Sequence, residues 1–202
     1  MLYIFNNKKI NNLLIKKIIN LLSKEINISI FTHLNFELKF EFIKNCILSK
    51  KSYVYLCYKG KKLVGCAVLA NNPSEYFNNS YPFKLKVLFY FFTRLKFKTL
   101  INIFLAFFKI DIILLNKSIK KIIKNNLNLN LIVVDKNYQS QGIGRSFFKK
   151  ILNDLKEKKK KIITLETENS RSISFYKKKM NFKIVGKKIR IPNNQTIMIK
   201  NF

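Results

Sequence analysis

Two closely spaced glycines stand between an apolar run and a helical pattern. Gly142 and Gly144 follow the segment LIVVD and a short polar loop, in a chain with only 5 glycines among 202 residues. Glycine permits tight backbone turns and lets a ligand approach the backbone without a Cβ in the way. A helix that begins at such a loop presents unpaired N–H groups and the positive end of its dipole. With Arg145 in the first turn, this segment predicts an anion site best suited to phosphate.

Three kinds of phosphate-binding loop compete for this pattern. A Walker A loop ends in Gly-Lys-Ser/Thr, but the chain reads Gly144-Arg145-Ser146 and does not fit. A dinucleotide fingerprint GxGxxG requires a third glycine where Phe147 stands, and it should open the domain rather than follow about 130 residues. Glu166, at the end of the next strand, could mimic the ribose-binding acid, so this alternative stays open.

The third kind fits the loop and has support downstream. The stretch Gln139-Ser140-Gln141-Gly142-Ile143-Gly144 resembles the Q/R-x-x-G-x-G/A motif of the GNAT superfamily of N-acetyltransferases. Asn169, together with the run FYKKKMNF at residues 175–182, resembles the N-x-x-A-x-x-F-Y-x-K-x-G-F stretch of the same superfamily. The resemblance is specific over residues 127–186. It extends more loosely to the first helices and hairpin.

Two positions depart from the superfamily pattern. Ser172 stands where a small alanine is usual, and Asn181 replaces the usual glycine. Asparagine tolerates a left-handed backbone, so we expect the turn at Asn181 to be retained. A structural glycine turn in an unrelated α/β domain is the alternative.

The surrounding elements match the layout that the resemblance implies. Apolar periodicity predicts a strand in LYIF, helices over 10–24 and 36–48, and a hairpin of YVYLCY and LVGCAVLA with Gly60 in the turn. Strand, glycine loop, helix, strand and helix then follow, and FKIVGKKI and QTIMIK end the chain as strands. We therefore expect an α/β (α+β) fold: one domain over residues 1–202, with a mixed, mostly antiparallel sheet flanked by helices.

Residues 71–126 are expected to form an apolar helical insertion between the third and fourth strands. The stretch 83–115 is apolar but seeded with charges, and its longest uncharged run is Thr99–Phe108. That run is shorter than the roughly 18 residues of a membrane span. The pattern favours two helices that cover part of the domain. The alternative is a lysine-fringed helix lying on a membrane surface.

Composition sets the electrostatics and the compartment. The formal net charge is +30, and only Arg94, Arg145, Arg171 and Arg190 among 40 basic residues are arginine. Much of this bias is typical of an A/T-rich genome, yet the charge still attracts anions. Three cysteines without C-x-x-C spacing predict neither a disulfide framework nor a metal site. Without a signal-peptide pattern at the amino terminus, a cytoplasmic location is expected, with contact at the inner membrane face as an addition.

The resemblance implies acetyl-CoA as co-substrate, no metal, and direct attack of a primary amine on the thioester. The backbone of Ile132 to Val134 would pair with the pantetheine arm, and N–H groups from Gln141 to Arg145 would hold the diphosphate. Tyr176 would be the general acid for the leaving thiolate, and the alternative for Tyr176 is a core aromatic residue. The cofactor-binding residues are Ile132, Val133, Val134, Gln139, Gln141, Gly142, Ile143, Gly144, Arg145 and Asn169.

The general base and the acceptor are less defined. Asn128 and Asn130 occupy the strand where many relatives carry a carboxylate, which leaves other candidates: Glu37, Glu41, Glu75, Glu166, Glu168 and His33. Proton loss to water is a further possibility. Because the chain is so basic, an anionic small-molecule amine, such as an amino sugar or its nucleotide, fits better than a lysine-rich tail.

Two other classes of function stay open at this point. The basic surface could belong to a nucleic-acid-binding module on an inactive fold, using lysines such as those at residues 156–161. Without a recognition helix or an aromatic RNA motif, nucleic acid is the weaker interpretation. Residues 83–115 could instead anchor a membrane-surface protein. The sequence does not define the oligomeric state.

Overall fold

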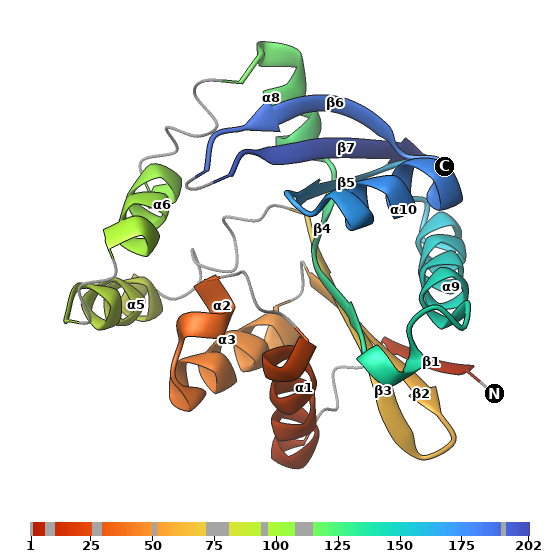
Figure 1. Ribbon diagram of the computed structural model, residues 1–202, viewed down its shortest axis with the longest axis horizontal. Helices are drawn as coiled ribbons and strands as arrows, with labels where there is room; N and C mark the ends of the chain where they lie inside the picture. Colours follow the sequence, from red (N-terminus) through yellow and green to blue (C-terminus); the bar gives the residue numbers. More distant parts are fainter. Residues whose placement is uncertain are drawn as a thin grey trace.

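The sheet and its flanking helices are seen in a computed structural model that describes residues 2–6, 11–25, 30–49, 52–71, 81–93, 97–107, 115–190 and 193–202. Seven strands form one sheet in the order β1-β2-β3-β4-β5-β7-β6, and every neighbouring pair is antiparallel except β4 and β5 (Figure 1). This confirms the expected mixed, mostly antiparallel sheet. The strands are β1 (Leu2–Asn6), β2 (Ser52–Lys59), β3 (Lys62–Ala70), β4 (Leu127–Val134), β5 (Ile162–Thr167), β6 (Lys183–Lys188) and β7 (Gln195–Asn201).

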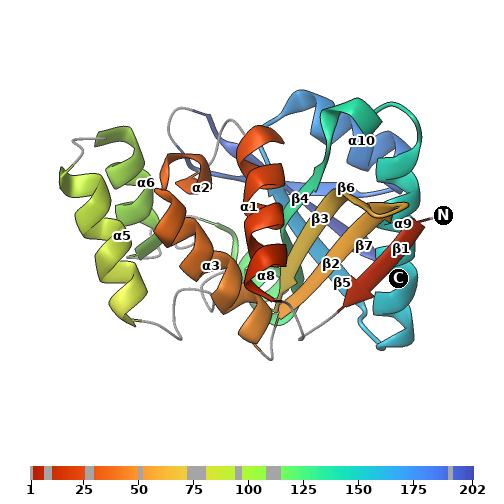
Figure 2. The same cartoon turned by 90° about the horizontal axis from the view of Figure 1, so that it is seen from below.

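Helices cover both faces of this sheet. Helices α1 and α3 contact β2, β3 and β4 on one face, and α9 packs on the other face (Figure 2). The helices are α1 (Asn12–Glu25), α2 (Ile30–His33), α3 (Phe36–Leu48), α5 (Tyr81–Thr93), α6 (Phe97–Phe107), α8 (Lys117–Asn125), the 3-10 helix η1 (Lys136–Tyr138), α9 (Ile143–Glu157) and α10 (Ser170–Met180).

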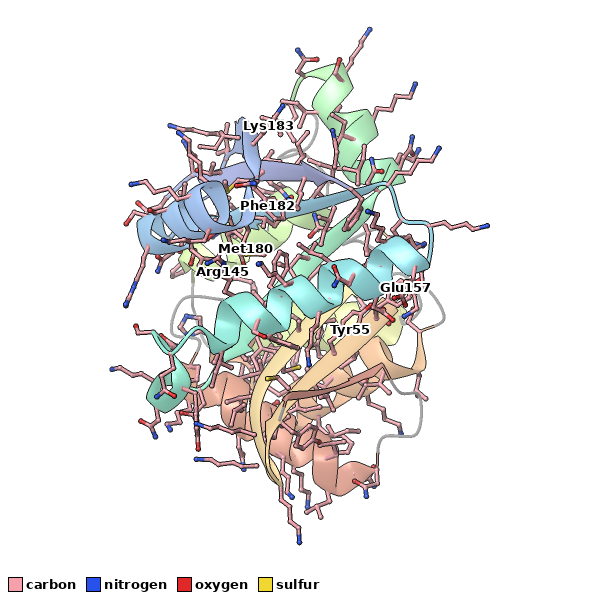
Figure 3. All side chains as sticks on the ribbon, turned by 90° about the vertical axis from the view of Figure 1, so that its right-hand side faces the viewer. Tyr55, Arg145, Glu157, Met180, Phe182 and Lys183 are labelled. Carbon is pink, nitrogen blue, oxygen red and sulfur yellow. The ribbon has the colours of Figure 1, made fainter. Side chains whose placement is uncertain are left out.

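The two faces of the sheet are separate hydrophobic cores, because alternate residues of a strand point to opposite sides. On β2, Tyr55 and Cys57 pack beneath α9, whereas Val54 and Leu56 pack beneath α1 and α3. Figure 3 shows α9 lying across its face of the sheet from Arg145 to Glu157, with Met180 and Phe182 at the end of α10 nearby. The Tyr55 hydroxyl also donates a 2.5 Å hydrogen bond to Asp154 of α9. This contact fixes the helix to the sheet at the end opposite the glycine loop.

Strand β4 is irregular where it meets both neighbours. Val68 of β3 pairs with Leu131 and Leu69 pairs with Leu129, so Asn130 is an extra residue that forms a β-bulge. On the other edge, β4 pairs with β5 only from Leu127 to Leu129. The strand then continues to Val134, away from β5 (Figure 1). The sheet therefore opens between β4 and β5, just before the glycine loop.

The segment between β3 and β4 contains α5 and α6 where two helices are expected, and also α8. Helix α5 packs against α3 and the residue that follows α2, because Val87 and Phe91 meet Leu38 and Leu34. Helix α8 covers β6 and β7 instead, with Ile123 buried against Ile197. The periodicity did not predict α8 as a separate helix. None of the helices in the described ranges is long and apolar enough to cross a membrane.

The turn after α10 adopts the backbone that the asparagine substitution allows. Asn181 has φ 57° and ψ 43°, a left-handed conformation, and its N–H donates to the Tyr176 carbonyl. The N–H of Phe182 donates to the same carbonyl at 3.0 Å, and the Phe182 side chain is buried. The expectation that the turn is retained is confirmed.

We expect Asn181→Ala to lower the free energy of unfolding by about 1 kcal/mol, since an L-residue with a Cβ is strained in this conformation. Asn181→Gly should unfold at the same urea concentration as the parent, or a higher one. Urea denaturation of the three proteins measures the difference. An alanine variant as stable as the parent would contradict the assigned turn.

Candidate active site

The glycine loop ends in an exposed helix start. Gly142 is the N-cap of α9 with φ 77°, and a Cβ built there would meet nothing within 4 Å. The first helical hydrogen bond at this end runs from the Ser146 N–H to the Gly142 carbonyl, at 2.9 Å. The N–H groups of Ile143, Gly144 and Arg145 come before it, so the helix itself offers them no acceptor. This open cradle of N–H groups suits a diphosphate.

Two glutamine side chains of the loop hold the loop itself. The Gln139 Nε2 donates to the Val134 carbonyl at 2.8 Å, and the Gln141 Nε2 donates to the Asn137 carbonyl at 2.9 Å. Both glutamines are exposed residues predicted to bind the cofactor. Their side-chain amides fix the path of the backbone from β4 to α9. Any contact from Gln141 to a phosphate would therefore come from its backbone N–H.

The motif comparison did not single out Asp135, which anchors the same loop. Its carboxylate is buried and accepts from the Asn137 N–H at 3.0 Å, while its own N–H donates to the Val64 carbonyl at 2.8 Å. Lys24 and Lys62 lie 3.8 and 3.9 Å from this carboxylate. The available signal was an acid directly after a buried strand and two residues before an asparagine, a spacing typical of a side-chain-capped turn.

The opening of the sheet leads to this cradle. Ile132, Val133 and Val134 line the part of β4 beyond its pairing with β5, and they run straight into η1 and the glycine loop. Val133 points to the core beneath α1 and α3, whereas Ile132 and Val134 face the core beneath α9. Along this stretch the described residues pair with β4 only at its edge toward β3, so the edge toward β5 can accept an additional extended chain.

Asn169 stands at the other side of the opening. It is the N-cap of α10, as the sequence suggests, and its Oδ1 accepts from the Ser172 N–H at 3.1 Å. The Asn169 N–H donates to the Thr167 Oγ1 at 3.3 Å. Because the amide oxygen serves the helix cap, the Nδ2 group is the part of this exposed side chain that can donate to a ligand.

Tyr176 lies within an aromatic cluster on α10. Its ring meets Phe148, Phe175 and Phe182 edge-on, with centroid distances of 5.8, 5.3 and 5.4 Å. The side chain is only 6% exposed, and burial raises the pKa of its hydroxyl well above its usual range. The phenol therefore stays protonated and able to donate at any physiological pH. The ring also packs as part of the hydrophobic core beneath α9.

These features agree with the match to known proteins. Residues 114–182, from the approach to α8 through the end of α10, match the model of the acetyltransferase (GNAT) family. This stretch is similar to the domain of the GNAT acetyltransferases. The similarity supports an acyltransferase of the kind that uses acetyl-CoA.

Solved structures of acetyltransferases show the same fold. The ribosomal-protein-S18-alanine N-acetyltransferase from Escherichia coli is 12% identical, with a TM-score of 0.59 over 100% of this chain and 94% of that one. PaiA N-acetyltransferase from Thermoplasma acidophilum, in complex with coenzyme A, is 12% identical, with a TM-score of 0.57 over 100% and 99%. An aminoglycoside 6'-acetyltransferase type Ii is 12% identical, with a TM-score of 0.60 over 100% and 96%. No curated protein sequence is significantly similar to this chain.

The carboxylates that could act as bases differ in their surroundings. Glu166 accepts from the Lys188 Nζ at 3.3 and 3.0 Å, and both side chains are largely buried. The Glu166 carboxylate is therefore already held in an ion pair within the protein. Glu41 lies 3.3 Å from the Lys86 Nζ. Glu168 is half-buried just after β5, beside Asn169, and it remains a candidate for the base.

The remaining candidates lie on the α1 and α3 side of the sheet or outside the described residues. Glu37 and Glu41 line a shallow cavity of about 320 Å³ along α3, together with Phe36, Phe40 and Lys44. His33 ends α2. Glu75 lies outside the described residues. Asn128, on the strand before the glycine loop, is buried and donates to the Thr164 Oγ1 at 3.0 Å. This hydrogen bond joins β4 to β5 where the two strands are still paired, before they diverge.

The three cysteines are buried and free, as a core role requires. Burial raises the pKa of Cys57 to about 11 and that of Cys66 to about 12, and it also raises the pKa of Cys46. These thiols are therefore not thiolates at neutral pH and are poor nucleophiles. The described residues contain no group of three or more His, Cys, Asp and Glu side chains placed to hold a metal ion.

Proposed function

We propose that the chain moves the acetyl group of acetyl-CoA directly to a primary amine, within one acetyltransferase domain over residues 1–202 that carries an insertion at residues 71–126. The observation that supports this most strongly is the divergence of β4 from β5 after Leu129, which leads to the exposed start of α9. A diphosphate and an extended arm need these two features side by side.

In this proposal, different residues bind the diphosphate and the pantetheine arm of the co-substrate. The N–H groups of Ile143, Gly144 and Arg145 hold the diphosphate, with the Arg145 guanidinium as an added cation. Lys59 and Lys62 lie over the Tyr138 ring at 5.1 and 5.0 Å and raise the positive potential beside the loop. The open edge of β4 from Ile132 to Val134 pairs with the arm, and the Asn169 Nδ2 donates to it.

Acetyl transfer forms a C–N bond to the amine and breaks the C–S bond of the thioester. Bound acetyl-CoA supplies a thioester whose carbonyl carbon the amine attacks, and the C–S bond then breaks. Tyr176 donates its phenolic proton toward the leaving sulfur. The amine loses its proton to water or to Glu168. Holding the amine and the thioester together provides much of the rate, because well-oriented pairs reach effective molarities of about 10⁵ M or more.

The acceptor in this proposal is an anionic amine, such as an amino sugar linked to a nucleotide. The support is electrostatic, because the chain has 40 basic residues and only 10 acidic ones. Such a field concentrates anionic substrates near the site and disfavours polyamines or lysine-rich tails. A cytoplasmic location is part of the proposal, and the three free cysteines support it.

Release of free thiol from acetyl-CoA over a panel of amines tests this function. The panel contains an amino-sugar nucleotide, the same amino sugar without its nucleotide, a polyamine and a peptide amine. We expect the nucleotide to give the highest kcat/KM, and its advantage to shrink as salt rises from about 50 to about 300 mM. A polyamine as the best substrate would contradict the anionic acceptor. Acetyl-CoA binding without thiol release from any amine would contradict the transfer reaction.

A further inference from the structure

Helices α5 and α6 expose large apolar side chains in a regular pattern. Leu85, Phe89 and Phe92 follow each other at spacings of four and three residues on α5, so they share one face. Phe97, Ile101 and Phe104 repeat these spacings on α6. Phe89 is 70% exposed, and Phe92 and Phe97 are each 67% exposed. We call the six residues of these two helices the α5–α6 patch: Leu85, Phe89, Phe92, Phe97, Ile101 and Phe104.

The core of the domain does not use this face of α5. Val87 and Phe91, which pack against Leu34 and Leu38, lie on the opposite side of α5 from Phe89. Thus α5 is apolar on both sides, and only one side is covered by the described part of the chain. Other exposed apolar residues, such as Leu13 on α1 and Leu48 at the end of α3, stand singly and need no partner.

The net charge of the chain indicates which kind of partner the α5–α6 patch binds. A second copy of the chain would bring two molecules of net charge +30 together, and their repulsion opposes a self-association through this patch. A surface that carries negative charge attracts the chain instead. Lys84, Arg94, Lys96 and Lys98 accompany the patch in the sequence. Aromatic and aliphatic side chains fringed by cations are typical of helices that bind anionic membranes.

We infer that the α5–α6 patch docks the protein on an anionic lipid surface, with both helices lying in the plane of the interface. Helices of 13 and 11 residues are about 20 and 16 Å long, which suits lying on a bilayer. Both views place α5 and α6 at one end of the molecule and α9 at the other (Figures 1 and 2). Docking through the patch leaves the glycine loop in water, open to a soluble co-substrate.

The absence of tryptophan from the chain gives a direct probe of this inference. Phe89→Trp places one tryptophan in the patch, and Leu13→Trp places one at a comparably exposed position on α1. With vesicles of phosphatidylcholine and about 30% phosphatidylglycerol, the emission from the Phe89→Trp variant should move to shorter wavelength and be quenched by brominated lipid. Emission from the Leu13→Trp variant should not change. Equal responses in both variants would overturn the inference.

Co-sedimentation with the same vesicles separates insertion from charge attraction. Phe89→Ser with Phe92→Ser should lower vesicle affinity at least about tenfold, whereas Leu13→Ser with Leu48→Ser should leave it unchanged. The parent should retain measurable binding at about 0.5 M salt, where electrostatic attraction is screened. Affinity that is equal in the two double variants, or that vanishes at this salt concentration, would contradict docking through the patch. So would a parent dimer without vesicle binding, if the Phe89 and Phe92 variant were monomeric.

Discussion

Gly142→Asp should lower the affinity for coenzyme A about 100-fold. The substitution places a carboxylate at the start of α9, where the N–H groups of Ile143 and Gly144 are proposed to hold the diphosphate. Two like charges about 5 Å apart repel by roughly 3 kcal/mol at an effective dielectric constant of about 20, which corresponds to a factor near 100. Calorimetric titration with coenzyme A measures the change.

Gly142→Asn is the matched control for this prediction. Asparagine has almost the shape of aspartate and also tolerates the left-handed backbone that Gly142 adopts at φ 77°. There is room for either side chain, because a Cβ at this position meets nothing within 4 Å. The asparagine variant should therefore lose only a few-fold in affinity. Equal affinities in the two variants would mean that no phosphate lies beside Gly142.

Tyr176→Phe should lower kcat about 100-fold and leave the affinity for coenzyme A nearly unchanged. A positioned general acid contributes typically about 10² to 10⁴ in rate, and phenylalanine removes only the hydroxyl. The ring would keep its edge-on contacts with Phe148 and Phe182, so we expect the melting temperature to stay within a few degrees. Single-turnover thiol release, with coenzyme A titrated separately, distinguishes catalysis from binding.

The pH profile gives this prediction its second readout. Because burial raises the pKa of Tyr176, the hydroxyl keeps its proton as pH rises to about 10, the usual value for tyrosine, and beyond. Tyr176 should therefore cause no loss of activity below about pH 10. Tyr53→Phe on β2 is the control, since its ring lies beneath Lys158 and Lys160 rather than beside the opening of β4 and β5. Full turnover in the Tyr176 variant would leave the residue with its packing role alone.

The parts of the site that could be predicted from the sequence are local in the chain. The glycine loop, the helix after it and the cap at Asn169 each depend on residues within a few positions, so their spacing carries the information. Asn181 is similar, because its left-handed backbone depends on one residue type. Tyr176 was identified as a general acid through its flanking motif. Its aromatic neighbours in the structure are equally consistent with a packing role for its ring.

Other features depend on contacts between distant segments. The pairing of Glu166 with Lys188 joins residues 22 positions apart, and it holds a carboxylate that looked available as a base in an ion pair. The end of the pairing between β4 and β5 is set by how two strands twist apart, which no local pattern reports. The apolar character of residues 83–115 was evident, but which face of α5 is exposed depends on how Val87 and Phe91 meet Leu34 and Leu38.

The central claim is that the backbone N–H groups at the start of α9 hold a diphosphate. Protein labelled with ¹⁵N-glycine tests it directly, because five glycines give five amide signals. Coenzyme A at moderate ionic strength should shift the signals of Gly142 and Gly144 in a saturable manner and leave those of Gly60 and Gly186 in place. Pantetheine, which lacks the diphosphate, should not reproduce the shift of Gly144. Unmoved Gly142 and Gly144 signals at millimolar coenzyme A would contradict the account.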